Sequence, residues 1–301
     1  MNIEHASPDS LPSAQGRVRV RLDLAYDGTS FKGWGIQPAL RTVQGELEAG
    51  LAKIVREKVR VTVAGRTDAG VHASGQVVHV DILEEQWRRM PGRSGRTSED
   101  SIIQRLAAVL PSDIAVHRAQ VVSRDFDARF SALARTYRYR ICDDYVRRDP
   151  LRRDVAFHKR HLDAEAMDDA ARALIGEHDF LSFCKPREDA TTIRTLHEIA
   201  WERPETGRDA GLVVAVVKAD AFCHRMVRSI VGASVAVGEG RLDAEWMAAL
   251  VTIPRRDEAV SAPMFAPSGL TLERIEYPKE SEWAARASQT RGKRGEPFTR
   301  G

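Results

Sequence analysis

Alternating polar and apolar residues recur along the chain and predict a series of short strands. The clearest example is RVRVRLDLA at positions 17–25, which is typical of a strand with one buried and one wet face because successive side chains point to opposite sides of a sheet. Similar alternation, or a short run of branched apolar residues between turn signals, predicts strands at 59–63, 76–82, 114–122, 134–142, 196–202 and 211–219.

Apolar residues that recur every three or four positions predict helices between these strands. After Thr42, whose hydroxyl can cap a first turn, Val43, Leu47 and Leu51 fall on one helical face. Further helices are predicted in the same way at 102–110, 162–175, 222–237 and 245–251. This mixture of helices and strands predicts an α+β fold.

The order of the elements predicts two domains of similar construction, each an antiparallel sheet backed by helices. We place the N-terminal domain at 17–124 and the C-terminal domain at 125–279. Both ends of the chain, 1–16 and 280–301, are polar and lack periodicity, so they are predicted to be disordered tails, the second of them basic. The stretch 84–100 mixes charge with Pro, Gly and Ser and is predicted to be an insertion loop.

Length and composition place the chain among soluble globular proteins. Its 301 residues, 43% of them hydrophobic, suffice for one large core or two medium ones. No apolar run approaches the roughly 20 residues that span a bilayer, and no basic and apolar leader opens the sequence. The protein is therefore expected in the cytoplasm, neither secreted nor embedded in a membrane.

The three cysteines give no sign of a covalent or metal-bound framework. Cys142, Cys184 and Cys223 stand far apart in the sequence and form no Cys-x-x-Cys pair. This spacing disfavours both a disulfide framework and a thiolate metal site, and it fits a reducing compartment.

Charge alone does not identify a ligand. The chain carries 46 basic and 43 acidic residues, a net charge of +3. Arginines nevertheless crowd the stretch 124–140 and recur at Arg225, Arg228, Arg255 and Arg256, where guanidinium groups could hold phosphates in a bidentate manner. The same residues also fit the solvated faces of an arginine-rich protein, so the choice stays open at this point.

The densest group of chemically special residues is VAGRTDAGVHASGQ at positions 63–76, between two predicted strands. Its glycines permit backbone shapes closed to other residues and allow a ligand to approach closely. Arg66, Asp68 and His72 would project from such a loop. By spacing alone, an ordinary turn in which Asp68 bonds its own backbone is the simpler interpretation.

This segment resembles the signature loop of the tRNA pseudouridine synthase A family, in which the aspartate of Arg-Thr-Asp is catalytic. Four further strings resemble family motifs in the same order along residues 17 to about 278, namely YDGTSFKGW, DFDARFSALARTYRYRI, GEHDFLSF and AFCHRMVRSIVG. The resemblance implies an isomerase that converts uridine to pseudouridine at positions 38–40 of tRNA. It also implies two similar α+β domains that face each other across a basic cleft, and a homodimer that binds the tRNA anticodon arm.

The resemblance also assigns roles to individual residues. Asp68 would be the catalytic carboxylate, Tyr137 the aromatic that stacks on the target base, and Arg228 the cation that pairs with Asp68. RNA contacts are predicted at Arg66, which would enter the space left by the displaced base, and at His72, Arg129, His224 and Arg225. One departure is Gly35 after Trp34, where the family often has Gln; it puts an RNA contact by a side chain at position 35 in doubt.

The reaction suits these residue types and requires no cofactor. The base is detached from ribose, turned and rejoined through carbon, without exchange of electrons, which agrees with the absence of a dinucleotide or phosphate-loop motif. A carboxylate can attack the sugar carbon, add to the base ring or abstract a sugar proton, and the sequence does not choose among these routes. In each route Asp68 must be ionised, and a neighbouring guanidinium would oppose the rise in pKa that burial causes.

Alternation places Tyr137 and Tyr139 on the same face of one strand, so either could serve the site or the core. We assign Tyr137 to the site, where an aromatic face can replace stacking that a displaced base loses, and Tyr139 to the core. Whether the Tyr137 phenol also moves a proton stays open.

Two other functions are compatible with parts of the sequence. A hydrolytic metal site could use Asp68, His72, His79 and Asp81, but their spacing is poor and no His-Glu-x-x-His pattern occurs, so no metal is expected. A non-catalytic RNA-binding module would have no use for Asp68, because a carboxylate in a cleft that attracts phosphate weakens binding. The enzyme is therefore favoured.

Overall fold

The fold is given by a computed structural model, which describes residues 16–185, 191–255 and 263–292. Within these ranges ten strands form one continuous sheet, with the order β4-β1-β3-β10-β5-β9-β8-β7, and with β2 paired to β3 and β6 paired to β5. The strands are β1 (Arg17–Tyr26), β2 (Thr62–Val63), β3 (His72–Leu83), β4 (Ile114–Val122), β5 (Ala134–Cys142), β6 (Ala156–Phe157), β7 (Gly176–Asp179), β8 (Ile193–Glu202), β9 (Val213–Ala219) and β10 (Leu270–Glu276).

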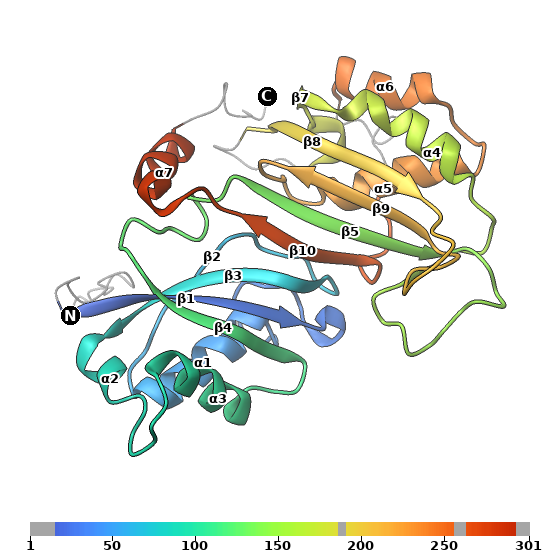
Figure 1. Ribbon diagram of the computed structural model, residues 1–301. Helices are drawn as coiled ribbons and strands as arrows, with labels where there is room; N and C mark the ends of the chain where they lie inside the picture. The colour runs from blue at the N-terminus through green and yellow to red at the C-terminus, as the bar shows by residue number, and fades with distance from the viewer. Residues whose placement is uncertain (1–15, 186–190, 256–262, 293–301) are drawn as a thin grey trace, which may run out of the picture.

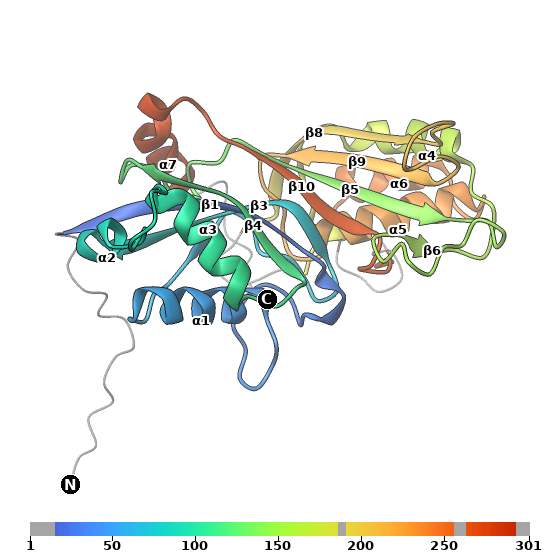
Figure 2. The ribbon, with the colours of Figure 1, turned by 60° about the horizontal axis from the view of Figure 1, so that its bottom comes forward.

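Helices cover the two halves of this sheet as separate groups (Figures 1 and 2). In both views α1 and α3 lie beside β1, β3 and β4, whereas α4, α5 and α6 gather at the half made of β5, β8 and β9. The helices are α1 (Val43–Val55), α2 (Glu84–Arg88), α3 (Ser98–Val109), α4 (Ala164–Ala171), α5 (Met226–Gly238), α6 (Ala244–Thr252) and α7 (Trp283–Arg291), with short 3-10 turns at Gly28–Ser30, Arg172–Leu174, Leu181–Phe183 and Glu280–Glu282. The predicted α+β class is confirmed.

Local patterns locate most of these elements correctly. In β1 the apolar residues of the alternation, among them Val20, Leu22 and Leu24, are at most 1% exposed. The Thr42 hydroxyl accepts from the backbone N–H of Gly45 and caps α1, as predicted from its place before an apolar face. Each of these elements is specified within a few residues of sequence, which is why the pattern suffices.

The sheets predicted for the two domains are continuous with each other at their junction. β10, which was not predicted, runs antiparallel to β5 and pairs with β3 in parallel at two positions, Thr271 with His72 and Leu272 with Ala73. A Cβ at Gly75 would lie 2.0 Å from the Glu273 carbonyl oxygen, so only glycine allows β3 and β10 to cross this closely. The two halves are therefore joined by backbone pairing, which fixes how they sit relative to each other.

Several boundaries shift because a tertiary contact or a cap overrides the local pattern. The helix predicted at 162–175 begins at Ala164, where the Asp163 side chain caps it, and the helix predicted at 222–237 begins at Met226. Only Thr62–Val63 of the strand predicted at 59–63 pairs in the sheet. The predicted insertion loop contains the short helix α2, which buries Trp87 to 7% exposure.

The predicted C-terminal tail is also partly ordered. Residues 283–291 form α7, and Trp283, 8% exposed, packs edge-on against Phe126 with ring centroids 4.9 Å apart. One buried tryptophan supplies enough apolar contact to fix a short polar helix that has little periodicity of its own. Residues 1–15 of the first predicted tail and 293–301 of the second lie outside the described residues.

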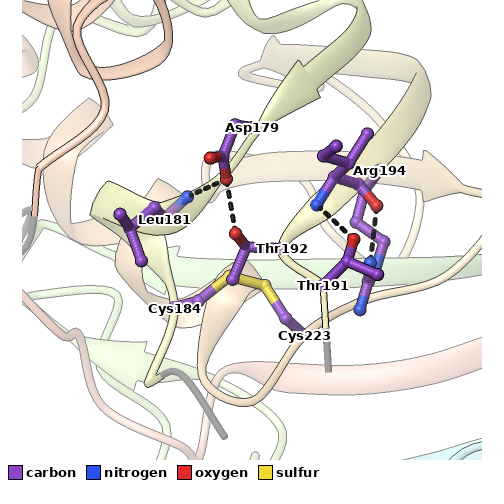
Figure 3. The surroundings of a disulfide bond; sticks show 8 residues. Asp179, Leu181, Cys184, Thr191, Thr192, Arg194 and Cys223 are labelled. Carbon is purple, nitrogen blue, oxygen red and sulfur yellow. Dashed lines mark hydrogen bonds between the residues drawn. A yellow bond between two sulfur atoms is a disulfide. The ribbon is translucent and has the colours of Figure 1, made fainter. Parts of the chain in front are cut away.

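The expectation of unpaired cysteines is wrong for two of the three. Cys184 and Cys223, 39 positions apart, form a disulfide with their Cα atoms 5.8 Å apart (Figure 3). Sequence distance did not exclude this pair because the turn Leu181–Phe183 and the segment before α5 meet in space. The bond joins the end of that turn to the residue directly before His224.

Reduction of this disulfide is expected to lower the free energy of unfolding. In the chain-entropy model a closed loop of this length contributes about 4 kcal/mol. The measurement is urea unfolding of the oxidised protein with and without dithiothreitol. The Cys184→Ser variant is the control, since its midpoint should not respond to the reductant. Equal midpoints for oxidised and reduced wild type would contradict the prediction.

Candidate active site

The site is built around the Asp68 loop, residues 64–71, which links β2 to β3. The loop is fixed at both ends and in its middle by backbone hydrogen bonds: Ala64 N–H donates to Val77 O at 2.9 Å, Trp34 N–H donates to Thr67 O at 3.0 Å and Gly70 N–H donates to Phe31 O at 3.2 Å. These bonds tie the loop to the YDGTSFKGW segment and to β3. The position of Asp68 therefore follows from the surrounding fold and not from the loop alone.

Buried polar side chains of β1 and β3 form hydrogen bonds to the same loop. The Tyr26 hydroxyl lies 2.8 Å from the Thr67 hydroxyl, and the Gln76 amide donates to both Tyr26 Oη at 3.2 Å and Gly65 O at 2.8 Å. Burial raises the pKa of Tyr26 to about 12, and its hydrogen bonds with Thr67 and Gln76 reduce that rise. Tyr26 thus remains a neutral hydrogen-bonding group that holds the residue next to Asp68.

The Asp68 carboxylate faces two basic side chains, His224 and Arg228, from the other half of the fold. Its Oδ1 lies 3.4 Å from His224 Nε2, and its Oδ2 lies 3.8 Å from Arg228 NH1. The side chain of Asp68 is 28% exposed and that of Arg228 is 12% exposed. At 3.8 Å the arginine attracts the carboxylate without a direct hydrogen bond, so the carboxylate stays accessible to a reacting group. The expected pairing of the two side chains is present in the structure.

Arg228 is held in this place by α5 and the segment that follows α6. Its Nε donates to Phe265 O at 2.8 Å, while Phe265 N–H donates to Arg228 O at 3.0 Å. Burial lowers the pKa of the guanidinium, and the Asp68 carboxylate raises it. An arginine pKa is high enough that the group stays charged at neutral pH. Its charge therefore acts on Asp68 from a fixed position.

His224 and Arg225 occupy the strained start of α5. Arg225 has φ +73°, in the left-handed region, which costs a residue with a side chain about 1–3 kcal/mol. This turn explains why the helix begins at Met226 and not at the predicted 222. The Cys184–Cys223 disulfide and the hydrogen bond from Lys185 N–H to His224 O at 3.0 Å hold the strained segment, so that His224 points at Asp68.

Tyr137 and Tyr139 share a face of β5, as predicted, and differ in their contacts. The Tyr139 hydroxyl donates to Ala266 O at 2.6 Å, and its side chain is fully buried. The Tyr137 side chain is 7% exposed, and its ring packs edge-on against Phe222 with the ring centroids 5.2 Å apart. Its pKa is raised chiefly by burial, with a further contribution from the nearby Asp68 carboxylate. Tyr139 is therefore a core residue, and Tyr137 lies in the electrostatic field of Asp68.

The other predicted RNA-contacting residues differ in their exposure to solvent. Arg66 and Arg129 are exposed, and the Arg129 guanidinium lies over the Phe130 ring at 5.0 Å. His72 is only 6% exposed, and its Nδ1 accepts from Gly28 N–H at 3.1 Å. Burial lowers its pKa, so a neutral, enclosed imidazole gives no support to the predicted phosphate contact at position 72.

The four residues of the alternative metal site have separate partners. Asp68 faces α5, His72 bonds Gly28, His79 accepts from Ala128 N–H at 3.0 Å, and Asp81 pairs with Arg19 at 2.8 Å. Over the described ranges, no group of three or more potential ligands is arranged to hold a metal ion. Likewise, no helix within those ranges is both long and apolar enough to cross a bilayer.

Some residues of the site were missed from the sequence. Tyr26 and Gln76 belong to strings that were recognised, yet nothing in their spacing showed that they support Thr67. Phe222 was predicted to be helical, whereas it precedes α5 and contacts Tyr137. The signal for all three is a contact between distant segments, which only the fold supplies.

The arrangement of a carboxylate loop from one half and a cationic helix start from the other agrees with comparisons to known proteins. A family model described as tRNA pseudouridine synthase matches residues 24–131 and 170–278. The chain belongs to this family. The two matched segments contain the Asp68 loop and α5, and the resemblance drawn from the motifs is confirmed. Membership also confirms the expected enzyme class, an isomerase, and agrees with a fold of two similar halves.

Relatives that carry the same family name align with this chain over nearly their whole length. A protein named tRNA pseudouridine synthase A from Streptomyces griseus is 48% identical over 94% of this chain and 96% of its own. Proteins of the same name from Leifsonia xyli and Frankia casuarinae are 49% and 48% identical; they cover 92% and 95% of this chain and 98% and 99% of their own lengths.

Proposed function

We propose that this tRNA pseudouridine synthase family member isomerises uridine to pseudouridine at positions 38–40 of the tRNA anticodon arm, with Asp68 as its catalytic carboxylate. The observation that supports this best is the placement of Asp68: a 28% exposed carboxylate on a fixed loop, beside His224 at 3.4 Å and Arg228 at 3.8 Å. A residue that merely closed a turn would need neither exposure nor cationic neighbours.

The reaction breaks the bond between ribose C1′ and uracil N1 and forms a bond between C1′ and C5. The proton on C5 leaves and N1 gains one, so the product is an isomer and no electrons are exchanged. Asp68 acts in one of three ways: attack on C1′, addition to the base ring or abstraction of a sugar proton. Each requires an ionised carboxylate within reach of the nucleoside, which the exposure of Asp68 permits.

Arg228 and His224 favour that ionised state. Positive charges within about 4 Å of a carboxylate oppose the effect of a flat base that covers it and excludes water. Arg228 is the permanent charge of the two, because His224 carries a charge only when it is protonated. Arg228 is therefore proposed as the residue that keeps Asp68 ionised once substrate is bound.

Tyr137 is proposed to stack on the target base. Removal of a base from its stack costs a few kcal/mol, and an aromatic face recovers about 1–3 kcal/mol. Burial raises the pKa of the Tyr137 phenol, so the phenolate that would be needed as a base at C5 is disfavoured at neutral pH. The packing of Tyr137 against Phe222 fixes its ring plane for contact with a nucleobase.

Arginines around the site are proposed to bind the phosphate backbone. We propose RNA contacts for Arg129 and Arg225 and the entry of Arg66 into the space left by the displaced base, because guanidinium groups bind phosphate well and stack on bases. The family resemblance adds a cytoplasmic homodimer to this proposal. Light scattering of the purified protein tests the dimer.

The function is tested by conversion of uridine in an unmodified tRNA transcript, with a metal chelator present. Wild type is expected to form pseudouridine in the anticodon arm, and the chelator is expected to leave the rate unchanged, because the proposed chemistry uses only side chains. A transcript with uridines 38–40 replaced by cytidine is the control and should give no product. Binding of tRNA without any conversion would refute the proposal and favour a non-catalytic RNA-binding protein.

A further inference from the structure

The guanidinium of Arg135 lies inside the wall of the site and binds three backbone carbonyls. Arg135 begins the RTYRY motif and is 8% exposed. Its NH1 donates to Asp220 O at 2.6 Å. Its NH2 donates to Ala64 O at 2.9 Å and to Arg129 O at 2.8 Å. One side chain thus contacts three segments that are far apart in the sequence.

Two of these segments carry the residues that face each other in the site. Ala64 begins the loop that carries Asp68, four positions later. Asp220 follows β9 and precedes His224 by four positions, on the path to Arg228. Alternation along β5 puts Arg135 on the same face as Tyr137, and the strand pairs Arg135 with Ala219 of β9. Arg135 therefore lies between the two halves of the site.

The chemistry of the contacts indicates what Arg135 does. All three acceptors are main-chain carbonyls, which move only when the backbone moves. Burial lowers the pKa of this guanidinium, so its charge is held at a cost in desolvation that an apolar residue of similar size would avoid. A planar group with several donors is suited to hold three carbonyls at fixed positions, which a lysine ammonium cannot reproduce.

We propose that Arg135 is a positioning residue, which sets the distance between the Asp68 carboxylate and the His224–Arg228 pair by fixing both backbones to β5. This inference rests on the proposed function of Asp68. Arg135 itself touches no reacting atom. Loss of the Arg135 guanidinium would let the two backbones shift relative to each other. Displacement of a catalytic group by as little as 1 Å can lower the rate about 100-fold.

The test compares Arg135→Lys with Arg138→Lys in single-turnover reactions at saturating enzyme. Arg138 lies on the same strand with its side chain on the opposite face, where it pairs with Glu273 at 3.0 Å. We expect Arg135→Lys to lower the rate constant about tenfold while the tRNA Kd stays within about twofold, the signature of lost geometry rather than lost binding. Arg138→Lys should change both constants by less than about twofold.

A second variant separates position from stability. Arg135→Ala, measured below its melting temperature, should recover part of the lost rate on addition of millimolar guanidinium chloride and none with sodium chloride at equal ionic strength. An unchanged single-turnover rate in Arg135→Lys, or a rise in Kd that accounts for the whole defect, would overturn the inference while wild-type activity upholds the proposed function. Failure of both Arg135 variants to fold, with Arg138→Lys folded, would also overturn it, since Arg135 would then serve stability alone. Inactive wild type would instead refute the proposed function.

Discussion

Replacement of Asp68 by asparagine is expected to lower the rate of pseudouridine formation by a factor on the order of 10⁴ or more. The amide has almost the same shape as the carboxylate but has neither a negative charge nor a strong nucleophilic oxygen. All three possible routes therefore fail together. The measurement is single-turnover conversion of an unmodified tRNA transcript, followed by the release of tritium from C5 of labelled uridine.

Binding of tRNA should survive the same substitution. Asp68 lies beside His224 and Arg228, so loss of its charge leaves this site more positive, and the affinity for a polyanion should be equal or higher. Asp113→Asn is a matched control, because Asp113 is 25% exposed and pairs with an arginine at 2.7 Å but is assigned no role in the reaction. Comparable rates for Asp68→Asn and Asp113→Asn would remove Asp68 from the mechanism.

Substitution of Arg228 by lysine is expected to lower the single-turnover rate constant about 100-fold, similar to the effect of removing one preorganised electrostatic group from an active site. Lysine keeps the charge but cannot both donate to Phe265 O, as Arg228 Nε does at 2.8 Å, and present a second nitrogen to Asp68. The ammonium could therefore contact either Phe265 O or the Asp68 carboxylate, but not both. The tRNA Kd should change much less than the rate.

The pH dependence of the Arg228→Lys rate gives a further readout. If the fixed position of the guanidinium beside Asp68 matters for catalysis, its loss should move the acidic limb of the rate profile to higher pH. Arg241→Lys, an exposed arginine beyond the end of α5 that pairs with Glu239, should behave as wild type. A wild-type rate and an unshifted profile in Arg228→Lys would show that the pairing has no part in catalysis.

The fold explains how Arg228, 160 positions after Asp68 in the sequence, comes to lie beside its carboxylate. The Asp68 loop connects β2 to β3, whereas His224 and Arg228 lie at the start of α5. β10 lies between β3 and β5 and joins these halves into one sheet. The distance between Asp68 and its partners therefore depends on how rigidly the two halves are joined. Gly75 contributes by allowing β3 and β10 to approach closely, and Arg135 is proposed to contribute by holding both backbones.

The sequence by itself identified the family. The loop GRTDAGVHASGQV and four further strings did so, and they led to the proposal of Asp68, Tyr137 and Arg228 as site residues, because the family motifs keep their residues in a fixed local order. Local periodicity likewise determined the α+β class and the core faces of β1 and α1, since alternation and capping act over a few residues.

Tertiary structure alone decided how the parts come together. The β3–β10 junction, the Cys184–Cys223 bond, the docking of α7 through Trp283 and the enclosure of His72 all arise from contacts between residues distant in the chain. Such contacts depend on the closure of long loops and on the surfaces that meet when they close. No short pattern encodes them. The same reason hid Arg135, whose role follows from three carbonyls in three segments and from nothing in its own neighbourhood.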